Sequence, residues 1–311
     1  MIFKFRAKKK MLKKERKIRA IIWSVLIVLA IFIVLAIVTM SYGIYKLDWR
    51  SSFIDKILRV VPLPVAAVNG NFISYPDYLI TLQAAERFYE KQKEMNFPGI
   101  PSQEEIKKMV RDRLIEDILI KKMASQYNVS VTSQDIENKT NEIIQNKGSQ
   151  ADLEKFLKDY YNLSLAQYKE FFIEPNLYYS KTNEAIMDDE AINGQAKKKI
   201  QEALSRLRNG EKFEDIAKQY SEDAKVGDNA SQENFLRGEL PKEIEDQLFS
   251  MKEGESTDVV EMSDSFQILK LVKKDEEKGV LTLQKIVVKI KTIDDLLKIE
   301  KEKAQIKIYA D

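Results

Sequence analysis

The chain contains no cysteine and no histidine among its 311 residues. Without cysteine it can form no disulfide and cannot use a thiolate as a nucleophile. Without histidine it lacks the commonest general base, the usual zinc ligand and any Ser-His-Asp triad. Any catalysis therefore has to use carboxylates, amines, amides or hydroxyls, and we expect no metal or other cofactor.

Charge is distributed unevenly along the chain. Residues 1–19 contain ten Lys or Arg and one Glu, so this tail carries +9. Since the net charge of the whole chain is +2, the remainder carries −7. Nucleic-acid binding needs a basic face, which a mildly acidic body does not favour.

An apolar run without charged residues follows the basic tail at residues 20–45. It exceeds the ~20 residues that cross ~30 Å of hydrocarbon. Its length speaks against the two alternatives, a buried helix of a soluble protein and a cleaved signal peptide. The basic side of an anchor faces the cytoplasm. We therefore predict a single-pass transmembrane helix with a cytoplasmic tail, 1–19, and an extracytoplasmic body.

The body begins with an amphipathic juxtamembrane segment, 46–61, and then a hairpin signal. The pair Asn69-Gly70 separates strand-like residues 65–68 and 72–74. A helix is predicted over 75–91. Further helices are indicated by capping residues three positions apart. These pairs are Ser102 and Glu105, Thr132 and Asp135, Ser149 and Asp152, and Ser164 and Gln167. Pro175 is expected to kink or end the last of these helices.

Residues 194–272 are predicted to form three amphipathic helices followed by two short strands. In the second helix, Phe213, Ile216, Ala217 and Tyr220 recur at helical spacing. Pro241 opens the third helix. The strands are predicted at 258–262 and 266–272, and later elements are a strand at 281–290, a short helix, and a strand at 304–311.

The sequence of this stretch resembles that of the parvulin family of peptidyl-prolyl isomerases. Residues 210–223 match the pattern G-x-x-F-x-x-[LI]-A-x-x-[YF]-S-x-D, and residues 235–249 match F-x-x-G-x-[ML]-x-x-x-[FI]-E-x-x-x-F. Residues 252–271 are similar to the family's closing segment. The resemblance implies an α/β domain with a small antiparallel sheet that isomerises X-Pro bonds.

The hairpin and the helices after it resemble the opening of SurA/PrsA-type chaperones. In such chains, the segment after the parvulin unit folds back on the N-terminal domain. By that analogy residues 305–309 pair with the 65–68 hairpin. The resemblance thus implies a helical chaperone domain of residues 62–190 plus 291–311, with a parvulin-like domain, 191–290, inserted. The fold class is α+β.

The resemblance also implies the site residues. Asp223 matches the polar residue beside the substrate carbonyl, and Gln267 stands where the family has a histidine. These two are the catalytic candidates. The substrate-binding candidates are Leu240, Ile244, Phe249, Met262 and Phe235. Asp223, Gln267 and Leu240 also have structural interpretations, as a cap, a core-edge amide and a core leucine respectively.

The family's first strand, A-x-H-I-L, is not found before the first helix, where MDDEAINGQAKKK stands. The later run LQKIVVKIK is similar to it and has Lys285 at the histidine position. This predicts a parvulin-like sheet whose first strand comes last in sequence.

Three functions remain open from the sequence. The first is a membrane-anchored foldase that isomerises X-Pro segments of unfolded or nascent secreted polypeptides. The second is a holdase-type chaperone with a catalytically degenerate parvulin domain, and the third is a single-pass scaffold that tethers a partner complex. The membrane is an expected partner in each case, and nucleic acid is not.

Overall fold

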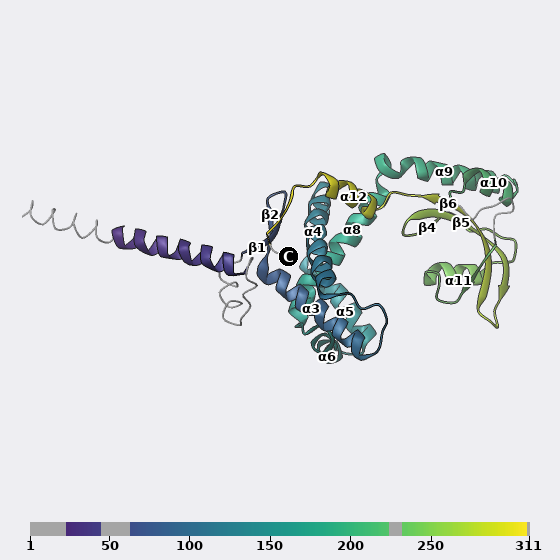
Figure 1. Cartoon of the computed structure of the whole chain (residues 1–311). Coiled ribbons are helices and arrows are strands. Elements are labelled where there is room, and N and C mark those ends of the chain that lie inside the picture. The colour runs from purple at the N-terminus through teal and green to yellow at the C-terminus, as the bar shows by residue number, and fades with distance from the viewer. Residues whose placement is uncertain (1–22, 45–62, 224–231, 310–311) are drawn as a thin grey trace, which may run out of the picture. The chain divides into compact units, whose positions relative to one another are not determined.

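The computed structural model describes residues 23–44, 63–223 and 232–309 (Figure 1). The basic tail and the predicted juxtamembrane segment 46–61 lie outside these residues. Two compact units divide the chain. The first unit comprises Met1–Ile115 with Gln305–Asp311, and the second unit comprises Glu116–Ala304. One helix, Trp23–Ile44, is long and apolar enough to cross a membrane, with a mean hydropathy of 2.9.

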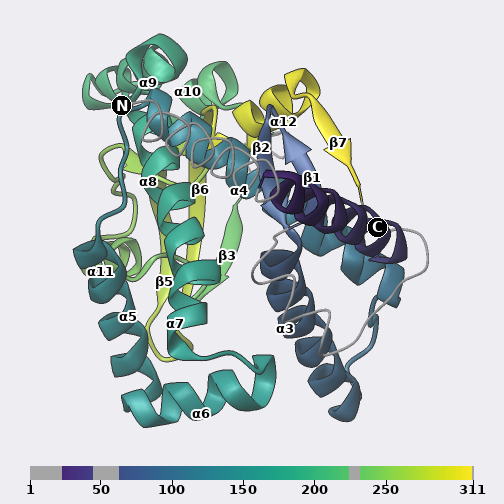
Figure 2. The same cartoon turned by 90° about the vertical axis from the view of Figure 1, so that its left-hand side faces the viewer.

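The first unit contains a three-stranded sheet in the order β2-β1-β7. Its strands are β1 (Pro64–Val68), β2 (Asn71–Ser74) and β7 (Ile306–Ile308). The hairpin turn uses Asn69 and Gly70, both at positive φ, as a tight two-residue turn requires. β7 pairs antiparallel with β1, with Ala66 opposite Ile308 and Val68 opposite Ile306 (Figure 2). This confirms the predicted return of the C-terminal strand to the N-terminal hairpin.

Among the described residues, helices follow this sheet from Tyr75 to Asp188 and return at Ile293–Lys303. They are α3 (Tyr75–Glu94), α4 (Gln103–Gln126), α5 (Ser133–Lys147), α6 (Gln150–Tyr161), α7 (Leu165–Tyr168), the π-helical η1 (Lys169–Ile173), α8 (Glu174–Asp188) and α12 (Ile293–Lys303). The predicted caps are present. Thr132 and Ser164 each take part in a reciprocal capping box, and Ser149 accepts from Asp152 N.

The helix that contains Pro175 does not end there. Pro175 lies in the first turn of α8, directly after η1, and the chain continues in helical conformation to Asp188. Proline cannot donate to the carbonyl four residues earlier, and a π-helical turn accommodates such a break in the hydrogen-bond ladder.

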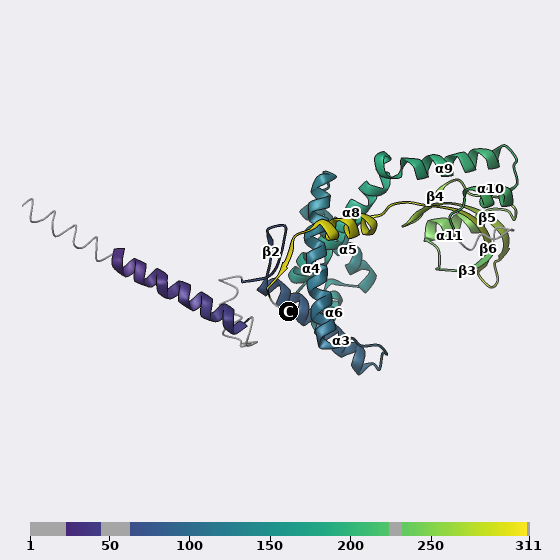
Figure 3. The same ribbon diagram turned by 45° about the horizontal axis from the view of Figure 1, so that its top comes forward.

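The second part of this unit is a four-stranded antiparallel sheet in the order β3-β6-β5-β4, with helices on both faces (Figures 1 and 3). Its elements are α9 (Glu190–Arg208), α10 (Phe213–Tyr220), β3 (Glu233–Leu236), α11 (Lys242–Ser250), β4 (Val260–Glu261), β5 (Ser265–Asp275) and β6 (Val280–Lys289). β6 pairs with β5 along its length and with β3 at its beginning. β6, which comes last in sequence among the four strands, therefore lies inside this sheet, as predicted.

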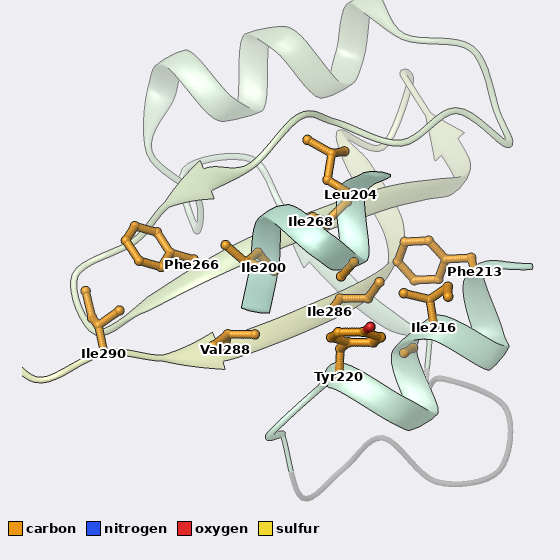
Figure 4. Packing of buried hydrophobic residues seen from close by; sticks show 12 residues of the cluster. Ile200, Leu204, Phe213, Ile216, Tyr220, Phe266, Ile268, Ile286, Val288 and Ile290 are labelled. Atoms are coloured by element: carbon orange, nitrogen blue, oxygen red, sulfur yellow. The ribbon is translucent and has the colours of Figure 1, made fainter. Parts of the chain in front are cut away.

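One face of the sheet packs on α9 and α10 (Figure 4). Ile200 of α9 and Ile216 of α10 are fully buried against Ile268 of β5 and Ile286 of β6. Burying a side chain of this size stabilises a fold by roughly 1.5–3 kcal/mol. The helical spacing in α10 therefore marks a core face.

Asn193 connects the two crossings between the helices and the sheet of this unit: the one from α8 to α9 and the one after β6. It lies in the first turn of α9 and is only 3% exposed. Its Nδ2 donates to Ile186 O at 2.9 Å and to Lys291 O at 3.0 Å, and its Oδ1 accepts from Lys291 N at 2.8 Å. The end of α8 and the segment after β6 are thereby fixed to the start of α9.

Candidate active site

The strand side chains of the candidate site share one face of the four-stranded sheet. The register places Lys285 opposite Leu269 and Glu233 opposite Leu283. Paired residues of an antiparallel ladder point to the same face, and so do alternate residues along a strand. The odd-numbered residues of β3, of β6 up to 287 and of β5 up to 271 therefore lie on one side, which we call the site face.

Four of the predicted substrate-binding residues come together on the site face. They are half-buried against a core of five leucines from α11, β5 and β6. The four are Phe235, Leu240, Ile244 and Phe249. β3, the loop after it and α11 thus build one apolar wall from residues that span fifteen positions of the sequence.

A buried carboxylate holds the loop between β3 and α11. Glu245 is 8% exposed and accepts a hydrogen bond from Gly238 N at 2.6 Å. Its other oxygen lies 3.6 Å from the Arg237 guanidinium, which lies 4.1 Å above the centre of the Phe249 ring. Gly238 has φ +88°, a conformation that favours glycine. This arrangement fixes the rim of the apolar wall.

Lys285 lies beside the wall and binds two carboxylates. Its Nζ is 3.1 Å from Asp223 Oδ2 and 2.9 Å from Glu233 Oε2. The three side chains are 19%, 18% and 23% exposed, so water screens them only in part. Burial alone would lower the pKa of Lys285, but the hydrogen bonds to Glu233 and Asp223 outweigh it and raise the pKa above its ordinary value.

Residues 221–223 lie along the edge of β6 that β3 leaves open. β3 pairs with β6 only as far as Leu283. Beyond it, Glu222 N donates to Val287 O at 2.7 Å, and Val287 N donates to Ser221 Oγ at 3.0 Å. Two chain segments therefore lie one after the other along this edge. Lys285 binds Asp223, at the end of the first segment, and Glu233, at the start of the second.

The two catalytic candidates have different surroundings. Asp223 is one of the two carboxylates at Lys285. Gln267 lies on the site face opposite Val287, so it is a diagonal neighbour of Lys285 across the ladder, and its Nε2 donates to Ser265 Oγ at 2.9 Å. Met262 follows β4 in the turn, where its N–H donates to Ser265 O at 2.8 Å. The roles of these residues remain predictions.

Glu233 belongs to the same ionic group, although the family motifs do not point to it. It precedes Phe235 by two positions on a short strand, and strand residues two apart share a face. That alternation is the sequence signal that could have placed Glu233 next to the apolar wall.

Two hollows of the second unit lie outside this group of residues. One, of about 630 Å³, is lined by the start of α9, Glu222, the end of β6 and the segment after it, and the other, of about 470 Å³, by α9, α10 and residues 254–258. None of the predicted site residues lines either hollow. Within the described ranges, no group of three or more acidic side chains is placed to hold a metal ion.

Comparison with known proteins finds two family models that match this chain. The model of the SurA-like N-terminal domain matches residues 1–171, more than half of the chain. The chain belongs to the SurA-like N-terminal domain family. The model of the PPIC-type PPIASE domain, a rotamase, matches residues 180–273. Both resemblances drawn from the motifs are thereby confirmed.

Relatives of this SurA-like chain include proteins named foldase protein PrsA. That of Geobacillus sp. (strain WCH70) is 27% identical over 202 residues, which cover 60% of this chain and 72% of the relative. That of Caldanaerobacter subterraneus subsp. tengcongensis is 27% identical over 222 residues, covering 66% and 72%. Foldase protein PrsA 1 of Listeria innocua is 30% identical over 150 residues, covering 47% of each chain.

The matched rotamase region ends before β6. Its last residue is 273, whereas Lys285 lies on a strand that begins at Val280. The wall and Asp223 lie inside the match, and the cation that binds Asp223 lies outside it.

Proposed function

We propose that this protein is a membrane-anchored, extracytoplasmic foldase that isomerises X-Pro bonds in unfolded secreted polypeptides. The observation that carries the proposal is the position of the Lys285–Asp223–Glu233 group beside the apolar wall. In this proposal residues 191–290 carry the isomerase site, and residues 62–190 with 291–311 form the chaperone domain.

The chemistry needs no cofactor. The barrier to rotation is ~18–20 kcal/mol because the C–N bond has partial double-bond character. A catalyst lowers this barrier by binding the twisted amide better than the planar one. The wall of Phe235, Leu240, Ile244 and Phe249 takes the proline ring. Asp223 and Lys285 provide a carboxylate and a cation next to the rotating amide, where preorganised charges act on its changing polarity.

The location rests on the helix Trp23–Ile44. It is 22 residues long, and no residue of its most apolar 18-residue window is buried. A run of this length and hydropathy spans a bilayer, and the basic residues before it favour a cytoplasmic N-terminus. The foldase name of the relatives supports unfolded polypeptides as substrates.

A protease-free isomerisation assay tests the proposal. The full-length chain in detergent micelles is added to a peptide with one X-Pro bond, and cis–trans exchange is followed by NMR. We expect faster exchange with wild type than with detergent alone, and a loss of most of the acceleration in Asp223→Ala. Exchange at the uncatalysed rate with the folded wild-type chain would refute isomerase activity.

A holdase is the second candidate, because the SurA-like match covers the helices rather than the site. A chain that gives no acceleration but suppresses aggregation of an unfolded client at equimolar concentration would be a chaperone with a degenerate site. A chain that does neither would favour the scaffold function.

A further inference from the structure

The edge of β6 that faces away from β5 has two successive partners in the described part of the chain. β3 occupies the first half of this edge, up to Leu283. Residues 221–223 occupy part of the second half. β3 runs antiparallel to β6, and residues 221–223 precede it in sequence by the segment 224–231. Asp223 and Glu233 therefore meet at Lys285 from opposite sides of this segment.

Ser221 supplies a side-chain acceptor where a regular strand would use its backbone. Its Oγ accepts from Val287 N at 3.0 Å and makes a long contact of 3.5 Å with Asp223 N. One hydroxyl thus contacts both the strand that carries Lys285 and the backbone of Asp223. A methyl group at this position would remove both contacts, whereas threonine would keep the hydroxyl.

Glu222 fixes the same segment from two directions. Its own N–H donates to Val287 O at 2.7 Å, and its Oε2 accepts from Lys289 N at 2.9 Å. Its Oε1 is 2.6 Å from Lys199 Nζ of α9. The segment is therefore attached both to β6 and to a helix on the opposite face of the sheet.

The residue before this segment is anchored in the core. Tyr220, the last residue of α10, is 6% exposed, and its hydroxyl donates to Glu202 of α9 at 2.6 Å. The backbone leaves the core at Tyr220 and reaches Asp223 three residues later. Over so short a distance, the hydrogen bonds of Ser221 and Glu222 restrict the positions open to the Asp223 carboxylate.

We propose that Ser221 and Glu222 are positioning residues that hold Asp223 on the open edge of β6, within reach of Lys285. The inference rests on the proposed function, because it assigns these residues to the same site. Neither side chain is expected to touch the substrate. Both affect the reaction by fixing the distance between the Asp223 carboxylate and the Lys285 ammonium.

The test compares variants of the full-length chain in detergent micelles. Ser221→Ala is the main variant, Ser221→Thr is the conservative rescue, and Ser205→Ala, an exposed serine of α9, is the matched control. Exchange of an X-Pro peptide gives kcat and KM. NMR of chains with isotope-labelled lysine gives the titration of the Lys285 side chain, whose signal is assigned by its loss in Lys285→Arg.

We expect Ser221→Ala to lower kcat by about ten- to a hundredfold, since small misplacements of a catalytic group cost this much, with KM nearly unchanged. The titration of Lys285 should move toward the value of an ordinary lysine. Ser221→Thr should restore both, and Ser205→Ala should change neither. A role in stability alone would leave the Lys285 titration of the folded variant unchanged, and that result would overturn the inference.

The two proposals fail separately. If the wild-type chain does not accelerate exchange, isomerase activity is refuted, and the Lys285 titration alone decides whether Ser221 positions Asp223. If Ser221→Ala does not fold, as judged by circular dichroism, Glu222→Gln replaces it. That variant keeps an acceptor for Lys289 N but loses the charge that binds Lys199. An unchanged Lys285 titration in folded Glu222→Gln would equally overturn the inference.

Discussion

Lys285 carries the positive charge at which two segments of the chain meet. A half-buried carboxylate needs a nearby cation to stay ionised at low cost, because desolvation of an uncompensated charge is unfavourable. In the resemblance drawn from the sequence, Lys285 takes the position of a parvulin histidine. A lysine stays charged through the neutral range, so this site should not show the change near pH 6–7 that a histidine would give.

Replacing Lys285 by methionine tests this assignment. Lys285→Met leaves Asp223 and Glu233 without the shared ammonium, so we expect a stability loss of about 1–3 kcal/mol and a roughly ten- to a hundredfold loss of kcat/KM. Urea denaturation and peptide exchange measure the two effects. Lys273→Met, at an exposed position of β5, is the control. Wild-type turnover in a folded Lys285→Met chain would show that Lys285 is not part of the catalytic site.

Tyr179 gives a prediction at high pH. Burial, followed by the hydrogen bond that its hydroxyl donates to Asp294 at 2.9 Å, raises the pKa of Tyr179 to about 12. The unfolded chain deprotonates this tyrosine near 10, so the stabilisation is complete below pH 10 and is lost as the pH rises toward 12.

Comparison of wild type with Tyr179→Phe isolates this effect. Between pH 10 and 12 wild type should lose more stability than the variant, by up to about 1 kcal/mol once solvent screening of this partly exposed group is included. Chemical denaturation at several pH values measures the difference, with Tyr178→Phe as the control. Parallel pH dependences of wild type and Tyr179→Phe would contradict the prediction.

Individual residues of the site were predictable to different degrees. Asp223 and the wall residues stand in motifs with fixed spacing, so local sequence is enough to make them candidates. Glu233 and Lys285 are 52 positions apart in sequence, and only the pairing of β3 with β6 brings them together. A linear motif cannot express a contact that depends on sheet register.

At the scale of elements, the helices and their caps follow directly from the sequence. Thr132 and Asp135, for example, form the reciprocal box that their spacing predicts. The π-helical turn before Pro175 does not follow, because the choice between ending a helix and widening one turn depends on the tertiary contacts of the residues beyond it. Ile186, near the end of α8, is fully buried, which favours continuation.

Asn193 shows how a single polar side chain connects several elements. In Asn193→Ala, Lys291 N and Lys291 O lose their partly buried hydrogen-bond partner, whereas Ile186 O keeps the bond from Asp189 N. Leaving such groups unsatisfied costs about 1–3 kcal/mol each, so we expect a total loss of roughly 2–4 kcal/mol. Urea denaturation measures it, and Asn176→Ala, at an exposed position of α8, should cost almost nothing. A loss below about 0.5 kcal/mol in Asn193→Ala would show that water replaces the amide.

At the scale of the whole molecule, the sheet of the first unit joins the two ends of the body. β1 (Pro64–Val68) is the middle strand, and its two neighbours are β2, which follows it directly in sequence, and β7 (Ile306–Ile308), which comes more than two hundred residues later. This contact between distant segments was predicted from the resemblance to SurA/PrsA-type chains. Hydrophobic pattern alone would not have paired them, since a three-residue strand carries little register information.

Removal of residues 305–311 should therefore weaken the first unit while leaving the candidate site intact. β1 would become an edge strand, although Val65, Ala66 and Val68 are fully buried in the intact chain. Asn69 N would lose its bond to Gln305 O, and Val65 O its bond from Tyr309 N. We expect amide hydrogen exchange at Asn69 and in β1 to accelerate at least tenfold, because exchange protection reports the free energy of local opening.

Hydrogen exchange of the full-length chain, the 305–311 deletion and a control that lacks only residues 310–311 distinguishes the possibilities. Amides of β6 belong to the second unit and should keep their protection in all three chains. Unchanged protection of Asn69 in the longer deletion would mean that β1 and β2 are stable without β7. Loss of protection in β6 as well would mean that the two units unfold together, and the C-terminal strand would then be needed for the site as well as for the sheet that it completes.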